Sequence, residues 1–283
     1  MRVFVASLLA MRVLGSLRCP KCQHVPDPNA DPNVIKADWV SNYNIPDGEK
    51  DGSKVYSDLY NHLYQSGKYH GPNADGTPAK GSHAHNIVRY LRNKTEIMSV
   101  FDVGCSHGRG VEMLWETGKV AAGIDIAELG VQRAIAWRCQ TPVVCNTTRC
   151  GAAASCFQVG SALAIPVSEK SYDAVISTDV LEHIFMDDVP KVLSEFTRVA
   201  RKMIVVKVAS MIELKNLAAE LNSPKTHGIQ NLHVTSQKLD WWKLQFEKVG
   251  WTLNEELQIK IYRGYYGGFE ASFVPLMSQM TNR

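Results

Sequence analysis

The chain has 283 residues, of which 45% are hydrophobic and 21% are charged, so it is long enough and apolar enough to form a full hydrophobic core. Its net charge of +3, without any run of five basic residues, gives no indication of nucleic-acid binding. No segment reaches the roughly 18 uncharged apolar residues that a membrane-spanning helix requires, so the sequence predicts no membrane span.

Residues 1–52 are expected to form an N-terminal arm rather than a domain. The first part has a positive start and a short apolar region, as a signal peptide has, but Arg12 interrupts it and Met11 is an alternative start. The stretch from Pro26 to Gly52 is rich in Pro, Asp, Asn and Gly, as irregular segments are. The arm therefore includes a candidate targeting segment, and both the cytoplasm and the lumen of the secretory pathway stay open as locations.

Residues 53–95 are expected to form a helical cap ahead of the first strand. Apolar residues and tyrosines recur at three- and four-residue spacing from Ser53 to Gly67, which predicts an amphipathic helix with Ser53 as its N-terminal cap. Residues 71–82 have the composition of a mobile loop. His83 and His85 follow this loop, and because the spacing supplies no third metal ligand, we interpret them as surface histidines.

The stretch 98–126 organises the rest of the chain. An apolar run at 100–103 without polar alternation predicts a strand buried on both faces of a parallel sheet. A glycine-rich turn at 104–110 follows, then residues at helical spacing, then a second apolar strand that ends on Asp125. Asp125 lies about 23 residues after Asp102, where a Rossmann-type unit carries the carboxylate that binds a ribose.

The sequence from Asp102 to Gly110, DVGCSHGRG, resembles the first motif of the class I S-adenosylmethionine-dependent methyltransferases, in particular the type 11-like, small-molecule branch. Ser106 stands where the family has a glycine. The resemblance implies that Asp102 and Gly104 hold the amino-acid end of S-adenosylmethionine and that Asp125 holds its ribose. The implied cofactor-binding residues are Asp102, Gly104, Cys105, Ser106, Gly108, Asp125, Ile126, Ser161, Ala162, Thr178 and Asp179.

The resemblance also implies the fold class: α/β, Rossmann-like and doubly wound, with a mostly parallel seven-stranded sheet at 96–276, helices on both faces and an N-terminal helical extension. The remaining elements fit this order. A helix is expected at 128–138, followed by strands at 157–159, 172–178, 201–208, 251–258 and 269–274, with a loop at 259–268. Residues 179–184, DVLEHI, close the fourth strand and resemble the family's fourth motif. Ser161 and Ala162 would lie beside the adenine, although Ser161 replaces a common family carboxylate.

The chain has seven cysteines, more than a reduced cytosolic enzyme needs. Cys105 lies in the cofactor turn, Cys19 and Cys22 form a CxxC pair, and the other four lie in an insertion at 139–156. Their even number and close spacing favour disulfides, as do two Asn-x-Thr glycosylation sites at 93–95 and 146–148. A four-thiolate zinc site is the alternative, but the insertion supplies no second CxxC.

The resemblance predicts methyl transfer to a small-molecule, lipid or sugar acceptor, with O-methylation favoured. His233 and His183 are the candidate catalytic bases, because neutral imidazole has a suitable basicity near pH 7. We favour His233 and expect no metal and no nucleic-acid partner. In the resembled family the helix before the first strand often covers the active site, so the tyrosines at 56–64 either pack on the sheet or contact the substrate.

Two other functions stay open at this point. A nicotinamide-dependent oxidoreductase would also use Asp125, but the turn lacks the GxGxxG spacing. A catalytically silent binding module of the same fold is the second alternative. The sequence gives no indication of the oligomeric state or of the acceptor's identity.

Overall fold

A computed structural model describes residues 51–67, 83–139, 145, 147–211, 221–229, 231–263 and 266–276. Seven strands form one sheet in the order β3-β2-β1-β4-β5-β7-β6. The first five pair in parallel, and β7 runs antiparallel to β5 and β6. The strands are β1 (Ser99–Val103), β2 (Val120–Asp125), β3 (Phe157–Val159), β4 (Tyr172–Thr178), β5 (Ala200–Ala209), β6 (Trp251–Arg263) and β7 (Tyr266–Pro275).

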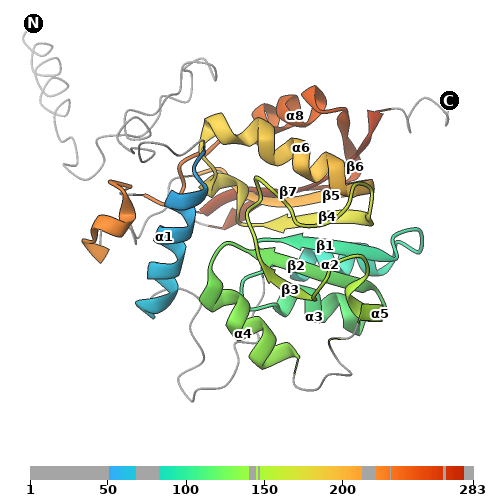
Figure 1. Ribbon diagram of the computed structural model, residues 1–283. Helices are drawn as coiled ribbons and strands as arrows, with labels where there is room; N and C mark the ends of the chain where they lie inside the picture. The colour runs from blue at the N-terminus through green and yellow to red at the C-terminus, as the bar shows by residue number, and fades with distance from the viewer. Residues whose placement is uncertain are drawn as a thin grey trace, which may run out of the picture. The chain divides into compact units, whose positions relative to one another are not determined.

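Helices cover both faces of this sheet (Figure 1). On one face lie α2 (His85–Arg92), α3 (Arg109–Glu116) and α4 (Glu128–Arg138), and on the other lie α6 (Val189–Val199) and α8 (Leu239–Lys248). The helix α1 (Ser53–Gln65) stands across one end of the strands, beside α4 (Figure 1). This arrangement confirms the predicted Rossmann-like, doubly wound α/β fold.

The strand order determines where a ligand can bind. The chain leaves β1 toward β2 on one side and returns to β4 on the other, so β1 and β4 are neighbours although they lie far apart in sequence. In open α/β sheets, ligands bind beyond the carboxyl ends of the strands at such a switch point. A ligand is therefore expected beside the residues that follow β1, β2 and β4.

Two local predictions were wrong. Gly52 is the N-cap of α1, and the Asp51 carboxylate accepts a hydrogen bond from the Ser53 N–H at 3.0 Å, so the Ser53 side chain does not cap this helix. The expected loop at 259–268 is largely strand, because β6 continues to Arg263 and β7 begins at Tyr266. The two strands pair with each other as a hairpin and β7 also pairs with β5, and this pairing outweighs the local glycine signal.

Two disulfides close the insertion at 139–156: Cys139 pairs with Cys145, and Cys150 pairs with Cys156. They confirm the preference for disulfides over zinc in this segment. The Tyr172 hydroxyl accepts a hydrogen bond from the Ala153 N–H at 3.0 Å, which ties the second loop to β4. Cys19 and Cys22 lie outside the described residues, as do most of the N-terminal arm at 1–52 and the predicted loop at 71–82. The predicted domain bounds stay predictions.

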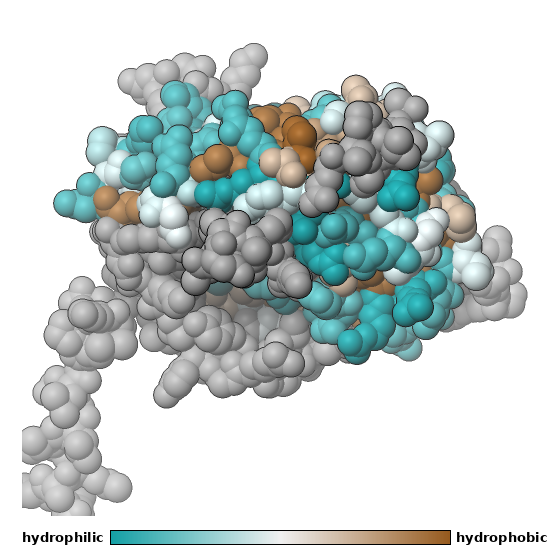
Figure 2. Space-filling model, turned by 90° about the horizontal axis from the view of Figure 1, so that it is seen from below, coloured by the Kyte–Doolittle hydropathy of each residue, from teal (hydrophilic) through white to brown (hydrophobic). Residues whose placement is uncertain are grey.

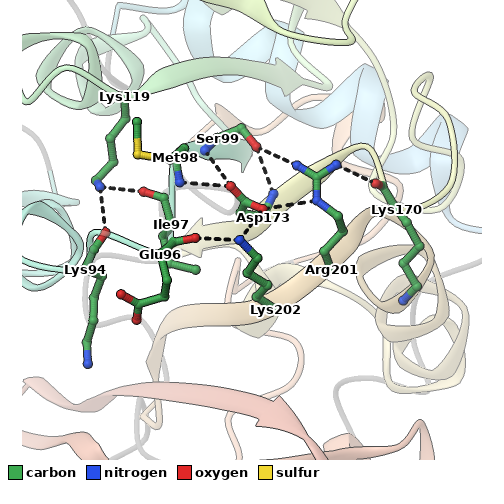
Figure 3. Close-up of polar contacts among 10 residues, drawn as sticks. All are labelled: Lys94, Glu96, Ile97, Met98, Ser99, Lys119, Lys170, Asp173, Arg201 and Lys202. Atoms are coloured by element: carbon green, nitrogen blue, oxygen red, sulfur yellow. Dashed lines mark hydrogen bonds and ion pairs between the residues drawn. The ribbon is translucent and has the colours of Figure 1, made fainter. Parts of the chain in front are cut away.

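The amino ends of the strands are held by a polar network around Asp173, on β4 (Figure 3). Its carboxylate accepts hydrogen bonds from the backbone N–H groups of Met98 and Ser99, at 2.9 and 3.2 Å, and from the Arg201 side chain at 3.1 Å. Lys202 adds an ion pair at 3.0 Å. These contacts stabilise the amino-terminal edge of the sheet, opposite the edge at which the glycine-rich turn lies.

The described surface is mostly polar on the face seen in Figure 2, where hydrophilic residues dominate and hydrophobic ones are scattered between them. In the described part of the chain, no helix has the length and apolar character needed to cross a membrane.

Candidate active site

The turn after β1 has the shape of a nucleotide-binding turn. Gly104 and Gly108 have φ angles of +84° and +78°, which residues with a side chain rarely adopt. A Cβ atom on Gly104 would lie 2.2 Å from the Val180 side chain, and one on Gly108 would lie 2.7 Å from Phe157. The turn therefore packs directly against the loop after β4 and against β3, and both glycines are required.

Ser106 occupies the position where the resembled motif has a third glycine, and it keeps the glycine conformation with a φ of +51°. Its N–H donates to an Asp125 carboxylate oxygen at 2.8 Å, and its hydroxyl lies 2.6 Å from the Tyr64 hydroxyl. These contacts offset the strain of a left-handed serine. They also join the turn to β2 and to α1.

Asp102, in β1, is buried, and its Oδ1 atom has no hydrogen-bond partner in the described part of the chain. Burial, together with the charge of Asp125, raises the pKa of Asp102 to about 7. A Cβ on Gly110 would lie 2.8 Å from Asp102 Oδ2, so this glycine makes room for the carboxylate. An orphaned buried carboxylate oxygen fits the ammonium group of the expected S-adenosylmethionine.

Asp125 closes β2, and both of its oxygens accept backbone hydrogen bonds, from Ser106 N–H and from Ala127 N–H, each at 2.8 Å. Burial raises the pKa of Asp125 to about 6, although the two donors favour its charged form. A carboxylate offers about four lone pairs, so Asp125 retains the capacity to accept from two ribose hydroxyls. The adjacent Ile126 is half-buried.

Cys105 contributes its backbone rather than its thiol. The Cys105 N–H donates to the Ile124 carbonyl at 2.8 Å, and its side chain is buried over Gly123. Burial raises the pKa of this thiol well above its usual value. The side chain is therefore a small packing group.

The predicted adenine side lies under the start of α1. Ser161 and Ala162 are half-buried. The Ser161 hydroxyl accepts from the Leu163 N–H and lies 3.2 Å from the Ser53 hydroxyl. The side chain of Ser53, which does not cap its helix, thus contacts a predicted cofactor residue.

The tyrosines of α1 are buried and contact both halves of the site. Tyr64 reaches Ser106 in the cofactor turn, as described above. The Tyr56 hydroxyl donates to Asp188 at 2.8 Å and accepts from the Phe185 N–H at 2.7 Å. Tyr60 packs edge-on against the His183 ring, with 5.7 Å between ring centroids. The helix therefore covers the carboxyl edge of the sheet.

Thr178 ends β4, and the next residue, Asp179, has a left-handed φ of +53°. Asp179 pairs with Lys207 at 2.7 Å and with His83. Burial opposes its ionisation, but the hydrogen bond from His83 and the charge of Lys207 lower the pKa of Asp179 to about 2. The His83 side chain is 61% exposed, as expected for a surface histidine, but its contact with Asp179 was not predicted.

The two candidate bases lie together, with 4.9 Å between the ring centroids of His183 and His233. His183 Nδ1 lies 2.9 Å from the Leu232 carbonyl, and His233 Nδ1 lies 2.6 Å from the Met211 carbonyl. Burial lowers the pKa of His233, against weaker opposing effects of Met211 and Asp179, which favours the neutral ring. Sequence reasoning paired these histidines by role, and the structure brings them into contact.

The middle of the chain is similar to a known family of domains. Residues 101–203 match a family described as a methyltransferase domain. No curated protein matches the sequence closely enough to count as a relative. Among solved structures, the complex between the Haloferax volcanii Trm112 methyltransferase activator and the putative methyltransferase contains a chain that is 17% identical, with 80% of this chain and 99% of that one covered and a TM-score of 0.50.

Two further solved structures score slightly lower. A magnesium protoporphyrin IX methyltransferase from Synechocystis PCC 6803, with bound S-adenosylmethionine, is 17% identical over 68% of this chain and 77% of that one, with a TM-score of 0.48. A methyltransferase dependent on S-adenosylmethionine from Methanosarcina mazei is 16% identical over 68% and 97%, with a TM-score of 0.49. The matched methyltransferase domain decides against the nicotinamide alternative. The chain therefore contains a methyltransferase domain of the class I, S-adenosylmethionine-dependent type, and S-adenosylmethionine is its cofactor.

Proposed function

We propose that this methyltransferase transfers the methyl group to a hydroxyl oxygen of a small-molecule, lipid or sugar acceptor. The observation that carries the proposal is the pair of imidazoles, His183 and His233, beside the end of β4. A hydroxyl group must lose its proton as it is methylated, and a neutral imidazole can accept that proton.

The cofactor-binding residues have distinct roles in this proposal. Asp102 pairs with the ammonium group, Asp125 accepts from the ribose hydroxyls, and Ser161 with Ala162 lies along the adenine. S-adenosylmethionine supplies a methyl group that is already activated by its sulfonium. The chain's own task is therefore to align the acceptor and to remove one proton.

The acceptor side is built from the residues after β4. Thr178 and Asp179 flank the methyl group, and the acceptor oxygen lies against the histidines. His233 donates its Nδ1–H to the Met211 carbonyl, which leaves the lone pair on Nε2, and this atom takes the proton. His183, held by the Leu232 carbonyl in the same way, orients the acceptor.

A direct assay tests the proposal. Purified protein is incubated with methyl-labelled S-adenosylmethionine and a panel of hydroxyl acceptors, each matched with the analogue that carries an amine instead. We expect label in the hydroxyl series, and we expect His233→Ala to lower kcat by about 10²- to 10⁴-fold. His227→Ala is the control, because the Nε2 atom of His227 pairs with Asp58, at 2.9 Å.

Two results would contradict the proposal. One is label in the amine series alone. The other is a kcat for His233→Ala, at saturating acceptor, equal to that of His227→Ala.

A further inference from the structure

Glu182 has a buried carboxylate, and only one of its two oxygens has a hydrogen-bond partner among the described residues. Its side chain is fully buried, and its Oε1 atom accepts a hydrogen bond from the Ala209 N–H at 3.0 Å. Its Oε2 atom has no hydrogen-bond partner among the described residues. A buried polar atom without a partner is costly, so such atoms are rare unless an ion or another ligand satisfies them.

The two histidines of the acceptor side lie next to this carboxylate. One potential ligand atom from each of Glu182, His183 and His233 lies within 4.8 Å of the other two. Ligands of a tetrahedral ion with bonds of about 2 Å lie about 3.3 Å apart. The three groups therefore need to approach one another by at most about 1.5 Å to share an ion.

Both imidazoles are also oriented as metal ligands usually are. Their Nδ1 atoms lie against backbone carbonyls, of Leu232 for His183 and of Met211 for His233. A metal-binding histidine commonly donates one ring N–H to a carbonyl or carboxylate, which fixes the ring and leaves the other nitrogen to bind the ion. The same hydrogen bonds place both lone pairs on Nε2.

We propose that Glu182, His183 and His233 bind a first-row divalent cation of the Zn²⁺ type, with at least one coordination position left open. Two imidazoles and one carboxylate suit such an ion better than Mg²⁺, which prefers an all-oxygen set. The sequence led us to expect no metal, and sequence spacing does not reveal this set because His233 lies 50 residues beyond His183.

The inference deepens the proposed function and rests on it for the occupant of the open position. There the cation binds the acceptor hydroxyl and lowers its pKa, so the proton leaves to water before the new O–C bond forms and the S–C bond breaks. With the ion bound, both imidazoles are ligands, and deprotonation no longer depends on a free His233.

Cation binding is measured without acceptor, so its result is independent of the methylation assay. Full-length protein carrying Cys19→Ser and Cys22→Ser, which removes the CxxC pair as a rival site, is titrated with Co²⁺ and followed by its visible absorption. Zn²⁺ and Mg²⁺ are then added as competitors. We expect one Co²⁺ per chain, displaced by Zn²⁺ but not by equimolar Mg²⁺.

Variants assign the site. We expect Glu182→Gln and His233→Ala each to weaken Co²⁺ binding at least tenfold, while His227→Ala binds it unchanged. Because Glu182 is buried, folding of each variant is checked by its binding of S-adenosylhomocysteine, and His233→Ala decides if Glu182→Gln does not fold. Absence of stoichiometric Co²⁺ binding, or unchanged binding by folded His233→Ala, overturns the inference and leaves the proposed function standing. Cation binding without hydroxyl methylation overturns only the proposed function.

Discussion

Cofactor affinity is expected to depend on pH through the two carboxylates of the cofactor turn. S-adenosylhomocysteine carries the same ammonium and ribose groups as the cofactor, so it binds best when Asp102 and Asp125 are both ionised. Their pKa values are raised to about 7 and about 6, mainly by burial. Acidification from above pH 7 to below pH 6 therefore protonates both groups.

The expected magnitude follows from these two values. Between pH 7 and pH 6, Asp102 falls from about one-half to about one-tenth ionised, and Asp125 falls from about nine-tenths to about one-half. The fraction with both groups ionised falls about tenfold, which is about 1.4 kcal/mol of binding free energy. Affinity should therefore rise with pH up to about 7.5 and level off above it.

Substituting Asp102→Asn separates the two groups. The variant loses the charged partner of the ammonium group, which costs about 1.5–3 kcal/mol of binding free energy at the pH values where the wild-type affinity is constant. Its remaining pH dependence comes from Asp125 and should be only about twofold between pH 7 and pH 6. Asp240→Asn, an exposed change on α8, is the control and should keep the tenfold dependence.

The assay is calorimetric titration with S-adenosylhomocysteine at several pH values and constant ionic strength, in two buffers that differ in ionisation enthalpy. Binding should release protons near pH 6.5, and Asp102→Asn should release fewer. The reasoning is refuted if wild-type affinity is the same at pH 6 and pH 7, or if Asp102→Asn keeps the full tenfold change.

Two further predictions concern stability. Hydrogen bonds from Met98, Lys202 and Arg201 lower the pKa of Asp173 from 3.8 to about 2 despite its burial, so its contribution of about 2.5 kcal/mol is present above pH 4 and is lost as the pH falls toward 2. In urea unfolding, Asp173→Asn should cost about that much at pH 7 and clearly less at pH 3, and an equal cost at both would contradict this reading. The disulfide between Cys150 and Cys156 closes a short loop, with a sequence separation of 6. Replacing both cysteines by serine should therefore lower the free energy of unfolding by about 2 kcal/mol. An unchanged thermal midpoint of the double variant would show that this disulfide does not stabilise the protein.

Much of the fold was predictable because its signals are local. The apolar run of β1, the glycines of the turn and the carboxylate at the end of β2 lie within 28 residues, and each acts on its own backbone. The prediction for the 259–268 segment was wrong because its glycines resemble those of a loop. The two arms of the segment pair with each other as a hairpin, with Arg263 opposite Tyr266, and β7 also pairs with β5, so strand pairing determines the conformation.

The site was predictable only in part. Spacing and the family resemblance singled out Asp102, Asp125 and both histidines, and the structure places the histidines in contact. No sequence signal pointed to the contact between His83 and Asp179, which lie 96 residues apart. Glu182 is part of the DVLEHI motif, but the sequence did not predict a role for it. Only its burial and its unpaired oxygen in the structure distinguish it from an ordinary carboxylate near the end of a strand.

Strain at the carboxyl edge connects these observations. Ser106 and Asp179 have left-handed φ angles of +51° and +53°, and they follow the neighbouring strands β1 and β4. Non-glycine residues keep such angles only when surrounding contacts hold them there. Each is held from the segment before β1, Ser106 by Tyr64 and Asp179 by His83. The N-terminal cap therefore does more than cover the site, because it fixes the backbone on which both the cofactor turn and the acceptor side depend.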